Sequence, residues 1–232
     1  MEKREDVNKS LKELYEEKWD NYIREIRNND NKINDFTNPY LIKVPEDYCT
    51  KDIVVMVYGK AADVWGGENG DNASIEDLIK LYDKYVNIDM GESGNYWNFM
   101  RDLRKRCPWA SFVFNNLFKM GSNEILNDKL SVNNFGIELM RREIEIIAPD
   151  IILFLGSASA NEYNVRMRSL IDSDRKEKSL GGDLRNVYEL EVSREPKFPL
   201  IYSTYNPSYM FFERDLVLDF FVEKINTLIK AK

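Results

Sequence analysis

Four short apolar runs, rich in β-branched and aromatic residues, are spread along the 232-residue chain. They lie at 53–58, 111–114, 151–155 and 200–203. Such short apolar runs are typical of strands that are buried on both faces, as in a parallel sheet. Segments with helical periodicity separate the runs, and this alternation indicates helices packed on both faces of the sheet. The sequence therefore predicts an α/β fold of three layers, α/β/α, around a central, four-stranded, mostly parallel sheet.

The spacing of apolar residues also predicts the helices and the remaining segments. Helices are expected at 4–27, 75–87, 95–105, 132–147, 157–171 and 211–229. Ser74 is expected to cap the second helix with Asp77, and Pro149 to stop the fourth. The alternating segment 187–192 predicts an extra or edge strand, and the charged segment 172–186 predicts an exposed loop.

No repeat or Pro-rich linker divides the chain, so we expect one domain over residues 1–232. Within it, residues 1–45 form an N-terminal helical extension and residues 50–232 form the α/β core. The charged N-terminus lacks the apolar stretch of a signal peptide, and no apolar run approaches the roughly 18 residues of a membrane span. We therefore expect a cytoplasmic protein that does not contact membranes; no oligomeric state follows from the sequence.

The chain contains no histidine, and its only cysteines are Cys49 and Cys107. The lack of histidine excludes Ser–His and Cys–His nucleophiles, His-ligated zinc and imidazole bases. Two cysteines are too few for a disulfide framework or for a metal site or iron–sulfur cluster with four Cys ligands. Acid–base chemistry would have to use Asp, Glu, Lys, Tyr or water. The net charge of −7 argues against strong non-specific DNA binding, although a local basic groove remains compatible with it.

Glycine, amide, hydroxyl and aromatic side chains follow the four predicted strands, at 59–65, 115–117, 156–157 and 205–208. Ligands of open parallel sheets bind beyond these carboxyl ends. An Asn amide can pair with the edge of a base, and an aromatic ring can stack on its face. No Walker-type phosphate loop is present. The strand ends therefore predict a pocket for a heterocycle rather than a site of phosphate transfer.

Four motifs occur in a fixed order: VVMVYGKAADVW (54–65), WASFVFNNLFK (109–119), REIEIIAPDIILFLG (142–156) and IYSTYNPSYM (201–210). In this order and spacing the chain resembles the uracil-DNA glycosylase-like superfamily, especially its poorly characterised bacterial branch. The resemblance covers residues 53 to 210. It implies hydrolysis of the N-glycosidic bond of a damaged or deaminated base that is flipped out of DNA for repair, with no cofactor and no metal.

Residue by residue, the resemblance assigns roles to the strand ends. It implies that the base is bound by Gly59, Trp65, Asn115 and Asn116, with either of the two asparagines reading the base. It implies two catalytic residues: Asp63 would be the water-activating base, and Asn206 would stabilise the departing base anion. Ser157 and Ser208 would bind phosphate.

The motifs depart from the family pattern at two positions. The family places an acidic residue after the first glycine, but Lys60 and Ala61 stand here and Asp63 lies further on. The family's late motif has His before Pro-Ser, but this chain has Asn206. These departures favour the alternative of a catalytically inactive module that binds a nucleobase, a nucleotide or a protein partner on the same fold.

Each assigned residue also has a plain structural explanation. The asparagines at 115 and 116 can be turn residues, Trp65 a packed loop aromatic, Asp63 a solvated carboxylate and Asn206 the start of a helix. A basic cluster on the predicted helix 95–105 could contact a nucleic-acid backbone, but a solvated helix face is the commoner role of such a cluster. An acidic loop at 68–77 fits no known calcium-binding pattern.

Overall fold

The computed structural model describes residues 4–28, 38–61, 65, 73–90, 93–119, 132–156, 161–171, 176–191 and 199–231. A mixed sheet of six strands lies at its centre, in the order β2-β1-β3-β6-β5-β4. The strands are β1 (Ile53–Ala61), β2 (Ala110–Phe118), β3 (Ile151–Leu155), β4 (Lys176–Ser179), β5 (Tyr188–Glu191) and β6 (Leu200–Thr204). The neighbours β2, β1, β3 and β6 pair in parallel. β5 pairs with β6, and β4 with β5, in antiparallel fashion.

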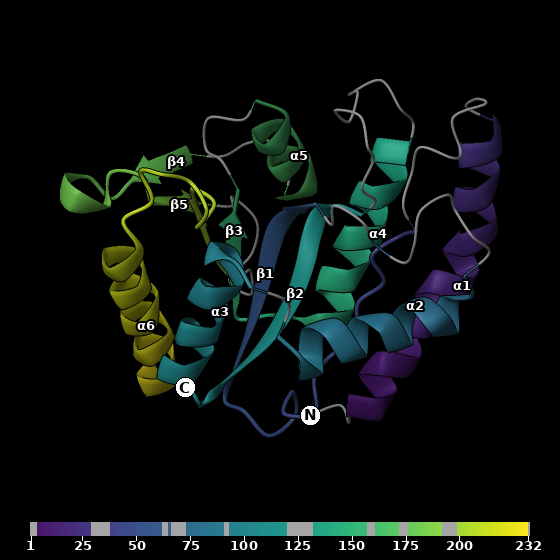
Figure 1. Cartoon of the computed structure of the whole chain (residues 1–232), viewed down its shortest axis with the longest axis horizontal. Helices are drawn as coiled ribbons and strands as arrows, with labels where there is room; N and C mark the ends of the chain where they lie inside the picture. Colours follow the sequence, from purple (N-terminus) through teal and green to yellow (C-terminus); the bar gives the residue numbers. More distant parts are fainter. Residues whose placement is uncertain are drawn as a thin grey trace.

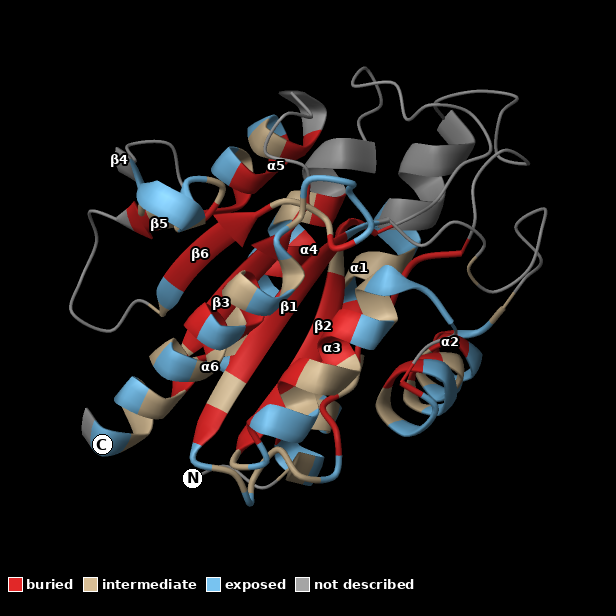
Figure 2. Ribbon diagram, turned by 60° about the vertical axis from the view of Figure 1, so that its left-hand side comes forward, coloured by how far each residue is buried: buried red, intermediate tan, exposed pale blue. Residues whose placement is uncertain are grey.

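Six α-helices accompany the sheet in the described part of the chain. They are α1 (Arg4–Asn28), α2 (Ile75–Tyr82), α3 (Asn95–Arg106), α4 (Val132–Ile147), α5 (Asn161–Ile171) and α6 (Arg214–Ala231). Helices α3 and α6 cover one face of the sheet, and α4 and α5 cover the other (Figures 1 and 2). Helix α1 packs against the outer side of α4.

The parallel strands form the core because their side chains are apolar on both faces. All five residues of β3 are buried, and Figure 2 shows β1, β2 and β6 buried along most of their length. At the free edge of β2, the hydroxyl of Tyr82 donates to the carbonyl oxygen of Phe114 (2.7 Å) and accepts from its amide (3.1 Å). An edge strand without such partners would offer its backbone to other chains.

Ser74 caps α2 as predicted. The amide of Asp77 donates to Ser74 Oγ (3.2 Å), and the amide of Ser74 donates to Asp77 Oδ2 (3.3 Å), which completes a capping box. Helix α2 ends at Tyr82, earlier than predicted, and continues as a π-helical segment, Asp83–Ile88.

The predicted four-stranded sheet is wrong in its extent, because β5 and β4 extend it to six strands. The alternating segment at 187–192 was expected to be a strand, and β5 confirms this. The segment 172–186, expected to be a loop, contains β4. Its sequence, KEKS, has no apolar residue, so only its pairing with β5 makes it a strand.

In the described part of the chain, no helix is long and apolar enough to cross a membrane.

Candidate active site

The carboxyl ends of the four parallel strands lie at one edge of the sheet. From β1 the chain crosses to β2 on one side, and from β2 it crosses back over β1 to β3 on the other side. Right-handed crossovers then place the connecting helices α3 and α4 on opposite faces. In open α/β sheets, ligands bind in the crevice at such a reversal of strand order. Gly59 of β1 and Gly156, which follows β3, border this crevice.

Asn115 and Asn116 lie inside β2 rather than after it, because the strand continues to Phe118. Successive side chains of a strand point to opposite faces, so the two amides are separated by the sheet. Asn115 pairs in register with Tyr58 and reaches Glu143 of α4, whereas Asn116 pairs with Gly59 on the side of α3. The two asparagines between which the sequence could not choose therefore face opposite sides of the sheet, Asn115 the α4 side and Asn116 the α3 side.

Both polar atoms of the Asn115 side-chain amide are hydrogen-bonded within the protein. Its Nδ2 donates to Glu143 Oε2 (2.8 Å), and its Oδ1 accepts from Lys119 Nζ (2.8 Å) and from the backbone amide of Asn116 (2.9 Å). Its side chain is buried, with only 1% of the residue exposed. Asn115 is therefore held as a structural residue, which also fixes the backbone at Asn116.

Lys119 and Glu143 form a buried ion pair behind β2, with Nζ 2.6 Å from Oε1. Lys119 Nζ also donates to the carbonyl oxygen of Tyr40 (3.0 Å), and the hydroxyl of Tyr15 donates to Glu143 Oε1 (2.9 Å). Burial lowers the pKa of the Lys119 ammonium, and the neighbouring Glu143 carboxylate opposes this effect. Burial, and then the charge of Glu143, raise the pKa of Tyr15, so its hydroxyl stays protonated as a donor.

On the α3 side, the side chains of Asn116 and Tyr96 lie together over Gly59, and these three residues are called the nook below. A Cβ atom placed on Gly59 would lie 2.7 Å from Asn116 Oδ1 and 3.3 Å from the Tyr96 hydroxyl oxygen, so both side chains lie across this glycine. Trp97 holds the first turn of α3 in place by packing edge-on against Tyr96 (5.2 Å between centroids) and Phe114 (5.5 Å). Burial raises the pKa of Tyr96, so this hydroxyl remains a hydrogen-bond donor at neutral pH.

Trp65 lies against Tyr40, with 4.5 Å between the ring centroids, and its carbonyl oxygen accepts from the amide of Asn38 (3.1 Å). Tyr40 in turn contacts Tyr82 at the free edge of β2 (5.3 Å). The indole is half-buried, and its buried Nε1 has no hydrogen-bond partner. These contacts place Trp65 in a packed aromatic cluster with Tyr40 and Tyr82.

Tyr163 of α5 fills the space above Gly156. A Cβ atom on Gly156 would lie 2.0 Å from the Tyr163 ring, and the Tyr163 hydroxyl donates to the carbonyl oxygen of Tyr58 (3.1 Å). The glycine after β3 is therefore required by an aromatic ring of the protein itself. The part of the crevice next to Gly156 is occupied by that ring.

Beyond β6, Asn206 and Ser208 form a turn. Asn206 Oδ1 accepts from the backbone amide of Ser208 (2.8 Å), which is the side-chain turn expected of an Asn before Pro. The Nδ2 group of Asn206 can still donate. Ser208 is exposed.

Asp63 and Ser157, the expected base and one of the two expected phosphate-binding residues, lie outside the described residues. Lys60, at the position where the family motif has an acidic residue, is exposed near the end of β1.

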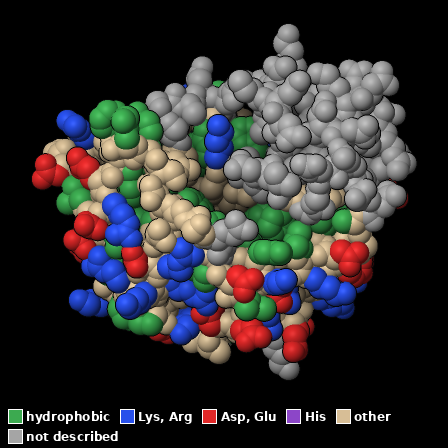
Figure 3. All heavy atoms as spheres, viewed as in Figure 1, with side chains coloured by type: hydrophobic (Ala, Val, Ile, Leu, Met, Phe, Trp, Pro, Cys, Tyr) green, Lys and Arg blue, Asp and Glu red, His purple; other side chains and the backbone are tan. Residues whose placement is uncertain are grey.

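The basic cluster of α3 makes contacts within the protein. Arg106 pairs with Asp219 (2.7 Å), Arg104 lies 3.7 Å from Asp47, and Arg101 donates to the carbonyl oxygen of Met90 (3.0 Å). Figure 3 shows Lys and Arg side chains mixed with Asp and Glu side chains over α3 and α6. This face is therefore a mixed one rather than a basic stripe.

Figure 3 also shows a recess in the upper middle of the same face, near the carboxyl ends of β1 and β3, bordered by hydrophobic side chains and a basic one. Among the described residues, no group of three or more Cys, Asp or Glu side chains is placed to hold a metal ion.

Sequence reasoning gave no role to Tyr96, Lys119 or Glu143. Lys119 and Glu143 both lie within the two middle sequence motifs, so the sequence did point to their segments. Their ion pair could not be predicted, because the two residues are 24 positions apart and no local pattern connects them. Tyr96 stands in the predicted helix 95–105, where the only feature singled out was the basic cluster.

These features define an α/β protein with a glycine, an amide and a phenol gathered at the strand-order reversal of its sheet. No model of a known protein family matches the chain, and no curated protein matches it significantly.

Proposed function

We propose that this chain is a uracil-DNA glycosylase-like protein that binds a base flipped out of DNA in the nook of Gly59, Tyr96 and Asn116. The observation that carries the proposal is the position of Asn116, whose amide lies across Gly59 at the reversal of strand order. Gly59 lets the side chains of Asn116 and Tyr96 lie directly over the backbone of β1, and the base binds against these two side chains. The order of the four sequence motifs supports the same assignment.

Asn116 is the base-reading residue of this proposal. A primary amide offers a donor and an acceptor side by side, which suits the edge of a base. Asn115, its hydrogen-bonding capacity used by Glu143 and Lys119, holds Asn116 in place through the Asn116 backbone amide. Tyr96, in the first turn of α3, lies against the bound base. The sequence analysis expected Trp65 in this role.

The proposed reaction is hydrolysis of the N-glycosidic bond. Asp63 accepts a proton from a water molecule, the water oxygen bonds to the sugar carbon, and the N-glycosidic bond breaks with its electrons leaving on the base as an anion. The Nδ2 group of Asn206 donates to that anion, while its Oδ1 is held by Ser208. Ser157 and Ser208 bind the flanking phosphates.

A second candidate is a module that binds a base or nucleotide without cleaving it. It is favoured by Lys60 and Ala61, which stand where the family motif has a carboxylate, and by Asn206, which cannot carry the positive charge of an imidazolium. Both candidates bind the base at the nook, so base binding does not distinguish them. Only cleavage of the N-glycosidic bond does.

The test uses single- and double-stranded DNA carrying one uracil, hypoxanthine or xanthine, scored for abasic sites, together with calorimetric titration of the free bases. Asn116→Ala should lower cleavage or base binding about 10- to 100-fold, because a lost pair of hydrogen bonds to a base is worth about 1–3 kcal/mol. Asn226→Ala, an amide removed from the middle of α6, is the matched control and should change neither.

Cleavage that depends on Asn116 and Asp63 supports the enzyme. Binding of a free base that depends on Asn116, without cleavage by the wild type, supports the binding module. Neither cleavage nor binding, or equal effects of Asn116→Ala and Asn226→Ala, would overturn the proposal.

A further inference from the structure

Three consecutive apolar side chains are exposed on the loop that follows β6. Tyr209 is 39% exposed, Met210 83% and Phe211 63%. Single apolar side chains on a surface are ordinary, but neighbouring ones that together form an exposed patch mark an interaction site. Residues 205–212 are called the aromatic loop below, because Tyr205 and Phe212 add two more rings to it.

Backbone hydrogen bonds hold the aromatic loop in two consecutive turns. The amide of Tyr209 donates to the carbonyl oxygen of Asn206 (2.8 Å), and the amide of Phe212 donates to that of Tyr209 (3.0 Å). Ring contacts join Tyr209 to Tyr205 (5.0 Å between centroids) and to Phe211 (5.5 Å). The exposed rings are therefore already ordered, so a ligand that stacks on them loses little binding free energy to their ordering.

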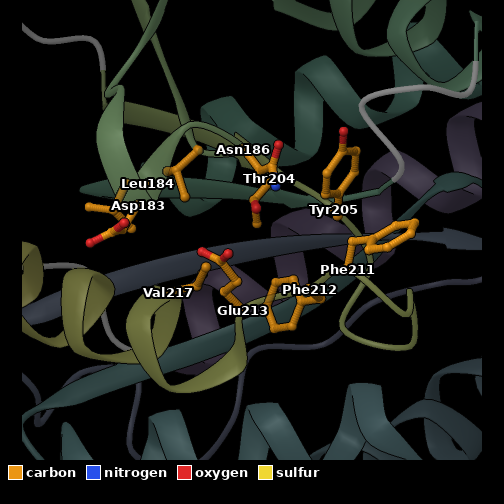
Figure 4. A pocket seen from close by; sticks show the side chains of 10 residues that line it. Asp183, Leu184, Asn186, Thr204, Tyr205, Phe211, Phe212, Glu213 and Val217 are labelled. Carbon is orange, nitrogen blue, oxygen red and sulfur yellow. The ribbon is translucent and has the colours of Figure 1, made fainter.

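The aromatic loop lies beside α3, the helix that carries Tyr96 of the nook. Phe212 packs edge-on against Phe99 (5.2 Å between centroids). Tyr96 precedes Phe99 by three positions, so the two rings belong to one side of α3. Figure 4 shows the rings of Tyr205 and Phe211 on the side of the loop that faces away from α6. A polymer that places one base at the nook can therefore extend over the aromatic loop.

The charges on the helices next to the aromatic loop disfavour a duplex. Arg214 of α6 pairs with Asp102 of α3, and Arg106 of α3 pairs with Asp219 of α6. Glu213, which follows the loop, adds an exposed carboxylate. Duplex DNA carries about twice the phosphate charge of a single strand per unit of length, and duplex binding depends on neutralising that charge. This surface is therefore less unfavourable to a single strand than to a duplex.

We propose that the aromatic loop binds single-stranded DNA by stacking, with one base at the nook and neighbouring bases on Tyr209 and Phe211. The inference rests on the proposed function of the nook. Stacking is open to a single strand because its bases present their flat faces, whereas in a duplex these faces are covered by the adjacent base pairs. The substrate of the nook is therefore a base in unpaired DNA.

The experiment measures binding of the full chain to a short fluorescein-labelled oligonucleotide by fluorescence anisotropy. The oligonucleotide carries one central uracil, whose sugar is fluorinated at C2′ to slow cleavage, and it is offered as a single strand and as a duplex. The single strand should bind about tenfold or more tightly than the duplex. Its log Kd should change with log salt concentration with a slope below about 2, because few phosphates are neutralised. A duplex bound as tightly as the single strand would overturn the proposal.

Substitutions in the loop test the stacking itself. Tyr209→Ser and Phe211→Leu should each weaken single-strand binding about fivefold or more, whereas Phe211→Trp, which keeps a ring, should retain it. Tyr85→Ser is the matched control, because this ring on the π-helical segment is 38% exposed, and it should change nothing. Thermal midpoints should stay the same in all four variants, since each substituted side chain is exposed.

The outcomes separate this inference from the proposed function. Free-base binding that needs Asn116, with single-strand binding indifferent to Tyr209 and Phe211, would overturn the inference alone. Single-strand binding that needs the two rings, without any binding of free bases, would support the stacking and overturn the proposed function of the nook. A dimer in sedimentation that Phe211→Leu dissociates would show that a second copy covers the rings, and would overturn the inference.

Discussion

At the scale of single residues, neighbours in the sequence have separate roles because a strand alternates its side chains between two faces. Asn115 joins the buried ion pair, and Asn116 faces Gly59. The glycines near the ends of β1 and β3 both make room for side chains of the protein itself. The side chains of Asn116 and Tyr96 lie over Gly59, and the ring of Tyr163 lies over Gly156.

Gly156→Ala should destabilise the protein by about 3 kcal/mol, at the upper end of what overpacking costs. The new methyl group would stand 2.0 Å from the Tyr163 ring, and the ring is buried and bound to the carbonyl oxygen of Tyr58. Urea unfolding measures the change. The control is a double-mutant cycle with Tyr163→Ala, in which Gly156→Ala should cost much less once the ring is gone. Additive costs would contradict the steric explanation.

At the scale of elements, the Lys119–Glu143 pair joins parts of the chain that the sheet alone does not hold together. Through Lys119, Glu143 and Tyr15 it connects the end of β2, helix α4 and helix α1. The carbonyl oxygen of Tyr40 adds the segment that leads toward β1. Helix α1, expected to be an extension of the core, thus contributes a buried hydroxyl to the network behind the nook.

Lys119→Met or Glu143→Leu alone should cost about 3–5 kcal/mol of unfolding free energy, because each leaves a buried charge without its partner. The double variant Lys119→Met/Glu143→Leu should cost clearly less than the sum, since no lone charge remains. Urea unfolding again measures the changes. Lys9→Met, which breaks an exposed pair with Glu13 on α1, is the control and should cost less than about 1 kcal/mol. If each single variant lost as little unfolding free energy as Lys9→Met, the ion pair would not be what holds β2, α4 and α1 together.

At the scale of the whole molecule, buried phenols are the dominant titrating groups of the core. Burial is the first cause of a raised pKa at seven tyrosines: Tyr15, Tyr40, Tyr58, Tyr82, Tyr96, Tyr163 and Tyr202. The pKa of Tyr202 is raised to about 12, and burial also raises the pKa of the Cys107 thiol to about 11. Each group keeps its proton in the folded state at a pH where the unfolded chain has lost it.

The stability of the protein should therefore fall steeply above about pH 10, where tyrosines of the unfolded chain ionise. Below that pH the contribution of the buried phenols is fully present, and it is lost as the pH rises toward their folded pKa values. Urea midpoints between pH 8 and 11.5, with tyrosinate absorbance as a second signal, measure this. Tyr202→Phe should flatten the loss, and Tyr209→Phe, at an exposed ring, should not. A flat stability profile through pH 11 would contradict the prediction.

The sequence alone determined the elements that local pattern encodes. The four apolar runs, the helical stripes and the Ser74 cap depend on residues within a few positions of one another, and each appears in the structure. It also predicted parallel strands, and the carboxyl ends of parallel strands lie at one edge of the sheet.

The tertiary structure decided what depends on distant residues. Pairing with β5 makes β4 a strand despite its KEKS sequence, and the run of β2 through Asn115 and Asn116 sends the two amides to opposite faces. The Lys119–Glu143 pair, the ring of Tyr163 over Gly156 and the place of Tyr96 beside Gly59 arise in the same way. Such contacts follow from packing between elements, and no periodicity within one element encodes them.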